Sequence, residues 1–115
     1  MEQDKKSRNK IKKASSMKKV YLKIHYRNEI ETIACCDEDL LNKVYKEGNL
    51  RIEISNQFFG GSLLSLEEAI DILSEATHFN IVGKNIIEKA IGNNLLPKEG
   101  VRIINGVPMA LKMMF

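Results

Sequence analysis

The sequence predicts one small α+β domain that follows a basic N-terminal arm. Its 115 residues are enough for a single domain of ordinary size. From Val20 onward, short alternating segments typical of strands are interspersed with apolar repeats at the helical period. Residues 1–16 contain one large apolar residue, Ile11, besides the initiator methionine. We therefore expect a disordered arm over residues 1–16 and a compact domain over residues 17–115.

The domain is expected to begin with a β-hairpin over residues 20–26 and 30–36. Polar and apolar side chains alternate in the first of these segments, and residues 27–29 supply a short turn. A helix is expected next, because Asp37 stands where an N-cap belongs and Gly48 where a helix stops. The apolar stripe of that expected helix consists of Leu40, Leu41, Val44 and Tyr45.

A third strand is expected over residues 50–54, where apolar and charged residues alternate. Ser65 and Glu68 have the spacing of a capping box, which predicts a helix start, and a second helix is expected over residues 81–91. Asn105 and Gly106 predict a tight hairpin between residues 101–104 and 107–113. The expected order is β-β-α-β-α-α-β-β, and neither face of the last hairpin is cleanly apolar.

Charge is divided unevenly along the chain. Residues 1–19 hold eight cations and two acids, a net charge of +6, whereas residues 20–115 hold ten cations and thirteen acids, a net charge of −3. Cations on a flexible segment release counterions when they meet phosphates, so the arm is a candidate RNA-binding segment. Two alternatives stay open: the arm only improves solubility, or translation starts at Met17. The candidate RNA-binding residues are Lys5, Lys6, Arg8, Lys10, Lys12, Lys13, Lys18 and Lys19.

A second candidate contact surface combines a glycine pair with a polar notch. The adjacent glycines Gly60 and Gly61 let the backbone approach a phosphate or base closely. The neighbouring Phe59 supplies an aromatic ring that stacks on a base. Asn80 and Gly83 fall between two expected helical segments and form a candidate ligand notch. The structural alternatives are a turn or bulge for the first group, and an N-cap with a close helix crossing for the second.

Metal binding and nucleophilic catalysis are not indicated, and no cofactor is expected. His25 and His78 lack the spacing of metal-binding motifs. The acids at residues 37–39 are accounted for by helix capping. The sequence contains no G-x-S-x-G, P-loop or dinucleotide-binding pattern, so no catalytic residue is assigned.

The chain is expected to be cytoplasmic. No apolar run approaches the roughly 20 residues that span a bilayer, and the N-terminus lacks the apolar region of a signal peptide. Cys35 and Cys36, the only cysteines, are neighbours that point to opposite faces of a strand, so we expect two free thiols.

Five short segments resemble an archaeal family known as domain of unknown function 424. They are residues 20–25, Cys36-Asp37 before Leu40-Leu41, Phe59-Gly60-Gly61, Ala76-Thr77 before residues 80–83, and Gly106-Val107-Pro108. The resemblance extends from about Met17 to the C-terminus and implies an archaeal protein of a family without an established activity, which is only loosely associated with translation. Relatives often carry histidine and glutamine where this chain has Met109 and Leu111, so polar chemistry at that hairpin does not transfer.

Three functional hypotheses follow. The first is a non-enzymatic binding module for RNA or a ribonucleoprotein, with the arm contacting phosphates. The second is a small enzyme or ligand-binding domain whose site lies between residues 58–61 and 80–83. The third is an adaptor that binds only proteins.

Overall fold

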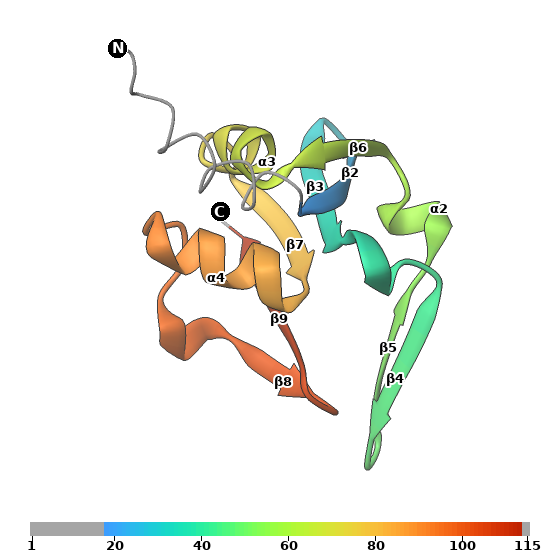
Figure 1. The fold of residues 1–115 in the computed structure, drawn as a ribbon. Helices are drawn as coiled ribbons and strands as arrows, with labels where there is room; N and C mark the ends of the chain where they lie inside the picture. Colours follow the sequence, from blue (N-terminus) through green and yellow to red (C-terminus); the bar gives the residue numbers. More distant parts are fainter. Residues whose placement is uncertain (1–17, 114–115) are drawn as a thin grey trace.

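The computed structural model describes residues 18–113, and within them six strands form one mixed sheet in the order β6–β2–β3–β7–β9–β8 (Figure 1). Strands β3 and β7 are parallel, and every other neighbouring pair is antiparallel. The strand bounds are β2 (Lys19–Arg27), β3 (Ile30–Asp37), β6 (Ser62–Ser65), β7 (His78–Val82), β8 (Arg102–Ile104) and β9 (Val107–Met113).

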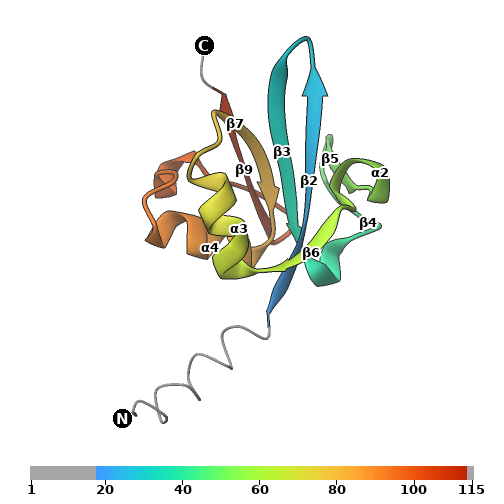
Figure 2. The same ribbon diagram turned by 90° about the horizontal axis from the view of Figure 1, so that it is seen from above.

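The remaining elements cover the two faces of this sheet. Helices α3 (Leu66–Leu73) and α4 (Lys84–Gly92) lie on the first face, whereas the hairpin of β4 (Lys43–Glu47) and β5 (Leu50–Ile54), together with the short helix α2 (Asn56–Phe59), lies on the second (Figure 2). Two 3-10 turns, η1 (Glu38–Leu40) and η2 (Lys98–Gly100), follow β3 and precede β8. The α+β class is therefore confirmed.

The β2–β3 hairpin forms as expected. Val20 pairs with Asp37 and Arg27 with Ile30, and the turn places Asn28 and Glu29 at φ values of 52° and 67°. Both turn positions are thus left-handed, as a two-residue hairpin with the right-handed strand twist requires.

The first core lies between the sheet and helices α3 and α4. Alternate residues of the strands meet the apolar stripes of both helices, which buries Leu22, Phe79, Ile81, Leu73 and Ile86. Each such side chain contributes roughly 1.5–3 kcal/mol when it is fully buried. This cluster therefore fixes the helix layer against the sheet.

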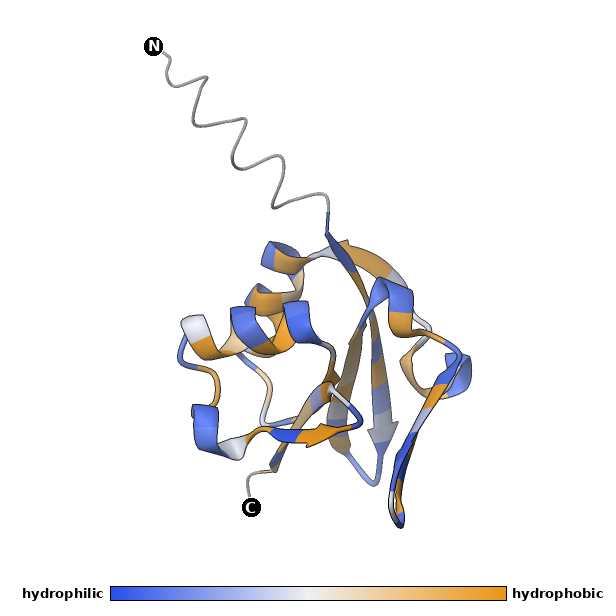
Figure 3. Cartoon of the chain, turned by 60° about the horizontal axis from the view of Figure 1, so that its bottom comes forward, coloured by the Kyte–Doolittle hydropathy of each residue, from blue (hydrophilic) through white to orange (hydrophobic). Residues whose placement is uncertain are grey.

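The second core lies between the sheet and the β4–β5 hairpin. Its buried members are Ala34, Cys36, Ile54, Phe59, Val82 and Val107. Hydrophobic and hydrophilic residues alternate along strand β5 of this hairpin (Figure 3). The partly buried Tyr45 and Ile52, which pair across the hairpin, pack against the second core. The sheet is thus covered on both faces in its central part.

Two predicted local signals are confirmed. Ser65 Oγ accepts from the Glu68 backbone N–H at 3.1 Å, and Glu68 Oε1 accepts from the Ser65 backbone N–H at 3.0 Å, which completes the capping box of α3. Strands β8 and β9 pair in the expected register, with Ile103 opposite Pro108. Val107 enters the second core and Ala110 the first, so this hairpin uses both faces.

The helix expected over residues 37–48 is wrong. Only η1 is helical there, and residues 43–47 form β4, which pairs with β5. Gly48, with φ of 60°, belongs to the hairpin turn and not to a helix stop. The β-branched and aromatic residues Val44 and Tyr45 suit a strand, and the apolar face of β5 supplies the partner that overrides the helical spacing.

The helix expected over residues 81–91 begins too early. Ile81 and Val82 belong to strand β7, and α4 starts at Lys84 after Gly83. A short apolar run flanked by polar residues does not distinguish a buried strand from a helix. The elements α2 and β6 were not predicted, because four residues are too few for a period to be read.

Candidate cleft beside strand β2

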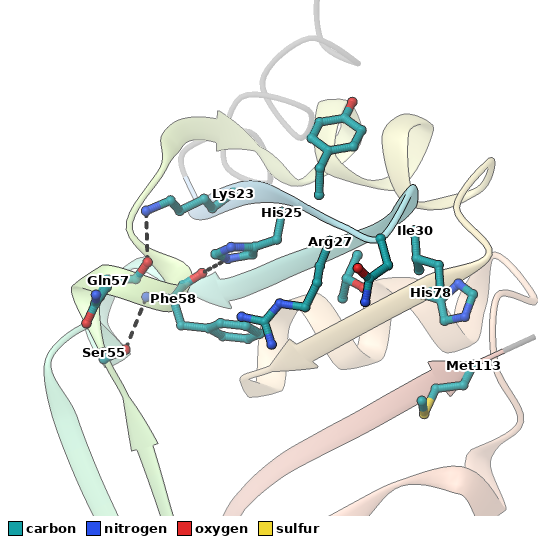
Figure 4. Close-up of a pocket in the computed structure, with 12 residues that line it drawn as sticks. Lys23, His25, Arg27, Ile30, Ser55, Gln57, Phe58, His78 and Met113 are labelled. Atoms are coloured by element: carbon teal, nitrogen blue, oxygen red, sulfur yellow. Dashed lines mark hydrogen bonds between the residues drawn. The ribbon is translucent and has the colours of Figure 1, made fainter.

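A cleft of about 730 Å³ lies on the second face of the sheet, between the far half of the β2–β3 hairpin and α2 (Figure 4). It lies beyond the part of the sheet that the β4–β5 hairpin covers. On the other side, the cleft is lined by His78 at the start of β7 and by Met113 at the end of β9, which pair with each other. We call it the β2–α2 cleft.

Strand alternation brings the floor residues of the cleft together. Lys23, His25 and Arg27 occupy every second position of β2 and therefore project to the same face. His25 pairs with Thr32, and Arg27 pairs with Ile30, so β3 continues the same surface. The periodicity of one strand thus places three basic or polar side chains in a row.

Helix α2 forms the wall and is fastened by side chains of β2. Ser55 caps it, with Oγ accepting from the Phe58 backbone N–H at 3.1 Å. Lys23 Nζ donates to the Gln57 carbonyl oxygen at 2.8 Å, and His25 Nε2 lies 2.8 Å from the Phe58 carbonyl oxygen (Figure 4). These contacts hold a four-residue helix that has little stability of its own.

An aromatic stack lines this wall. The rings of His25 and Phe58 are stacked with centroids 4.6 Å apart and an interplanar angle of 14°. Phe59 meets Phe58 edge-on, with centroids 5.0 Å apart. Phe58 is half-buried and borders the cleft, whereas Phe59 is buried in the second core.

The cleft is electropositive. Of the twelve described residues that line it, Lys23 and Arg27 are cations, His25 and His78 are histidines, and none is a carboxylate. Within residues 18–113, the ion pairs found are Arg51 with Glu53 and Lys89 with Glu67, so neither cleft cation is neutralised by an acid. An anionic group is therefore the complementary ligand.

Of the candidate RNA-binding residues of the arm, the structure describes Lys18 and Lys19. Lys5, Lys6, Arg8, Lys10, Lys12 and Lys13 lie outside the described residues. Lys18 Nζ lies 3.5 Å from Asn85 Oδ1, and Lys19 begins β2 opposite Ser65. Both therefore lie at the end of β2 remote from the cleft, roughly 25 Å from Arg27 at the rise of an extended strand.

The glycine pair follows α2 and has close structural neighbours. A Cβ on Gly61 would collide with the Leu22 carbonyl oxygen, and a Cβ on Gly60 would collide with the Asn56 side chain. These glycines let the chain pass from α2 into β6 against the edge of β2. Of this group, Phe59 is buried, and the neighbouring Phe58 is the ring that borders the cleft.

Asn80 and Gly83 lie apart from the glycine pair. Asn80 is in the middle of β7, where its Oδ1 is buried without a hydrogen-bond partner among the described residues. Gly83 precedes α4 with φ of 125° and packs against the Asp37 carboxylate. Both residues fall between two helices along the chain, α3 and α4, but strand β7 occupies part of that interval and contains Asn80.

The described residues supply no metal-binding cluster. No group of three or more His, Cys, Asp or Glu side chains that could hold a metal ion occurs within residues 18–113. No helix in the same range is long and apolar enough to cross a membrane. Cys35 and Cys36 are free and buried on opposite faces of β3, one in each core.

Of the residues that line the cleft, only Phe58 belonged to a site expected from the sequence. The available signal was the basic residue at every second position of β2, from Lys23 to Arg27. Phe58, Thr32 and His78 join that row only through strand pairing and the placement of α2, which a single sequence does not reveal.

Comparison with known proteins supports the resemblance noted above. A family model described as "Protein of unknown function (DUF424)" matches residues 24–114. A solved structure of an uncharacterized conserved protein from Methanopyrus kandleri is similar, with a TM-score of 0.72 and 23% sequence identity. The match covers 84% of this chain and 95% of that one, and it establishes a shared fold. No curated protein matches the chain. Since the family model spans most of its length, this chain belongs to the DUF424 family.

Proposed function

We propose that this domain is a non-enzymatic binding module for single-stranded RNA, and that the β2–α2 cleft receives part of the strand. The observation that carries the proposal is that the described lining bears cations and no carboxylate and includes a half-buried aromatic ring. Cationic grooves that track a phosphate backbone and rings that stack on bases are the two parts of sequence-tolerant single-strand binding.

The position of the positive charge favours this ligand. Residues 20–115 carry more acids than cations, yet none of the described residues that line the cleft is an acid. Glu67 and Glu68 of α3 lie in the helix layer on the opposite face of the sheet. A polyanion would therefore be attracted to the cleft face.

The N-terminal cations are part of the proposal. They precede Lys19 at the start of β2, and Lys23 and Arg27 continue the charge along the same strand. If the net six charges of the arm engage single-stranded RNA, the logarithm of the binding constant should fall against the logarithm of salt with a slope of about −4.

Fluorescence anisotropy with a labelled single-stranded oligoribonucleotide tests the proposal across a salt titration. The double variant Lys23→Gln with Arg27→Gln should bind more weakly, and its salt slope should be shallower by about 1.4, because two phosphate contacts are lost. The matched control is Lys46→Gln with Arg51→Gln, which removes the same two residue types from the β4–β5 hairpin. The control should bind like the unaltered protein.

Equal affinity and slope for the cleft variant and the hairpin control would exclude the cleft as the RNA site. A chain that starts at Met17 separates the contribution of the arm. An unchanged slope in that chain would remove the arm from the mechanism while leaving the cleft in it.

A further inference from the structure

We propose that the β2–α2 cleft is a complete mononucleotide pocket, which binds a nucleoside monophosphate without the rest of an RNA chain. The inference rests on the proposed function, since such a nucleotide is one unit of the strand. It goes further by assigning the base to Phe58 and the phosphate to Arg27.

The base platform is the ring of Phe58. His25 stacks on one face of this ring, and the ring of Phe59 lies nearly perpendicular to it, with centroids 5.0 Å apart. The half-buried Phe58 side chain borders the cleft (Figure 4). His25 Nε2 also holds the Phe58 carbonyl oxygen at 2.8 Å, so the platform is set before a ligand arrives. A preset ring costs little ordering entropy when a base stacks on it.

The phosphate ligand is the guanidinium of Arg27. It is exposed and extends into the cleft on the same side as Phe58 (Figure 4). No ion pair among residues 18–113 occupies it. Its planar fork donates two parallel hydrogen bonds to phosphate oxygens, which a lysine does not. Lys23 uses one N–H on the Gln57 carbonyl oxygen and retains two others.

The other lining residues suit the rest of a nucleotide. Ile30 and Met113 supply an apolar wall, and Asn28 and Thr32 supply an amide and a hydroxyl. The apolar side chains Ile30, Phe58 and Met113 thus stand among polar and basic ones, and about 730 Å³ lies within the usual range of small-ligand sites. The cleft therefore has room for a base and a sugar phosphate together.

Isothermal titration calorimetry on the full chain tests the pocket with adenosine monophosphate, adenosine and ribose phosphate as separate probes. We expect one saturable site for adenosine monophosphate and weaker binding of either half. Phe58→Leu keeps the apolar volume but removes the ring, so the nucleotide should bind about fivefold more weakly or worse. Phe58→Tyr keeps the ring and should restore the affinity.

Arg27→Gln should lower the affinity for adenosine monophosphate but leave the affinity for adenosine unchanged. The control Arg51→Gln should change neither affinity. Thermal unfolding of each variant verifies that it folds. Absence of nucleotide binding at millimolar concentration, or equal affinity in Phe58→Leu and the unaltered protein, would overturn the pocket. If the RNA oligonucleotide still bound through the cleft cations, the proposed RNA-binding function would stand without the mononucleotide pocket. If the protein bound the nucleotide but not the RNA oligonucleotide, the pocket would stand and the proposed RNA-binding function would fail.

Discussion

Asp37 and Gly83 pack so closely that a side chain on residue 83 would occupy the space of the Asp37 carboxylate. The carboxylate accepts hydrogen bonds from the backbone N–H groups of Asn85 at 2.9 Å and Ile86 at 3.0 Å. The end of β3 thus caps the N-terminus of α4, 48 residues further along the chain. Strand β3 and helix α4 are thereby joined by one buried side chain.

Replacing Asp37 with Ala should destabilise the domain by about 3 kcal/mol. The change removes a helix cap and leaves two N–H groups of α4 without their acceptor. Asp37→Asn keeps one acceptor oxygen and should cost about 1–2 kcal/mol, since Asn is also a good capping residue. Urea denaturation measures both values. A midpoint for Asp37→Ala equal to that of the unaltered protein would show that the cap contributes nothing.

The same residue makes stability depend on pH. Burial raises the pKa of Asp37 above its ordinary value of 3.8, although the hydrogen bonds from Asn85 and Ile86 lower it. The folded protein therefore keeps the proton at pH values where the unfolded chain has lost it. The contribution of Asp37 to the free energy of unfolding is largest below pH 3.8 and falls as pH rises through the raised pKa. The difference between the unaltered protein and Asp37→Asn, measured by urea denaturation at several pH values, should decrease over that window. An increase would mean that the hydrogen bonds outweigh burial.

Gly83→Ala should destabilise by at least about 2 kcal/mol. Residue 83 has φ of 125°, which an L side chain rarely adopts, and a Cβ there meets Asp37. Gly92→Ala is the matched control, because nothing lies near the added methyl at the end of α4. That control should stabilise by about 0.5–1 kcal/mol through helix propensity. Thermal and urea unfolding measure the change in the free energy of unfolding for the two variants. Equal changes would show that residue 83 is not strained by a side chain.

Ser65→Ala should cost about 1 kcal/mol, because it removes the acceptor for the Glu68 backbone N–H and half of the capping box of α3. Ser62→Ala changes a neighbouring exposed serine of β6 that caps nothing, and it should leave the urea midpoint unchanged. Indistinguishable midpoints for the two variants would show that the capping box is energetically silent.

The two thiols should be inert in the folded protein. Burial, followed by the charge of Asp37, raises the pKa of Cys36 to about 12, and burial raises the pKa of Cys35 as well. Since the thiolate is the reactive form, a colorimetric thiol reagent at pH 8 should modify neither residue until the domain unfolds. The measured rate should follow global unfolding when urea is added. Rapid modification of one thiol without urea would show local opening of β3.

Local rules predicted the elements whose signals are complete within a few residues. The turn after β2, the capping box of Ser65 and Glu68, and the Asn105–Gly106 hairpin each depend on neighbours in the chain. Asp37 shows where such rules stop. It was expected to cap a helix formed by the residues that follow it, and this is wrong: its carboxylate accepts from the first N–H groups of α4 instead.

The candidate site was less accessible to sequence reasoning than the fold. Lys23 and His25 were placed on one face of a strand, but that face borders a cleft only because α2 folds back onto β2. Phe58 and Phe59 are adjacent in sequence, and tertiary packing alone buries one ring and leaves the other beside the cleft.

The sequence by itself determined the α+β class, the hairpins at both ends of the domain, the start of α3 and the separation of charge along the chain. Tertiary structure decided that residues 43–47 form a strand, that β3 pairs with β7, and that His25, Phe58 and His78 meet around one cavity. The physical reason is the distance along the chain over which each interaction acts. Turns and caps are satisfied by neighbouring backbone groups, whereas strand pairing and cavities depend on which distant surface buries the same apolar face.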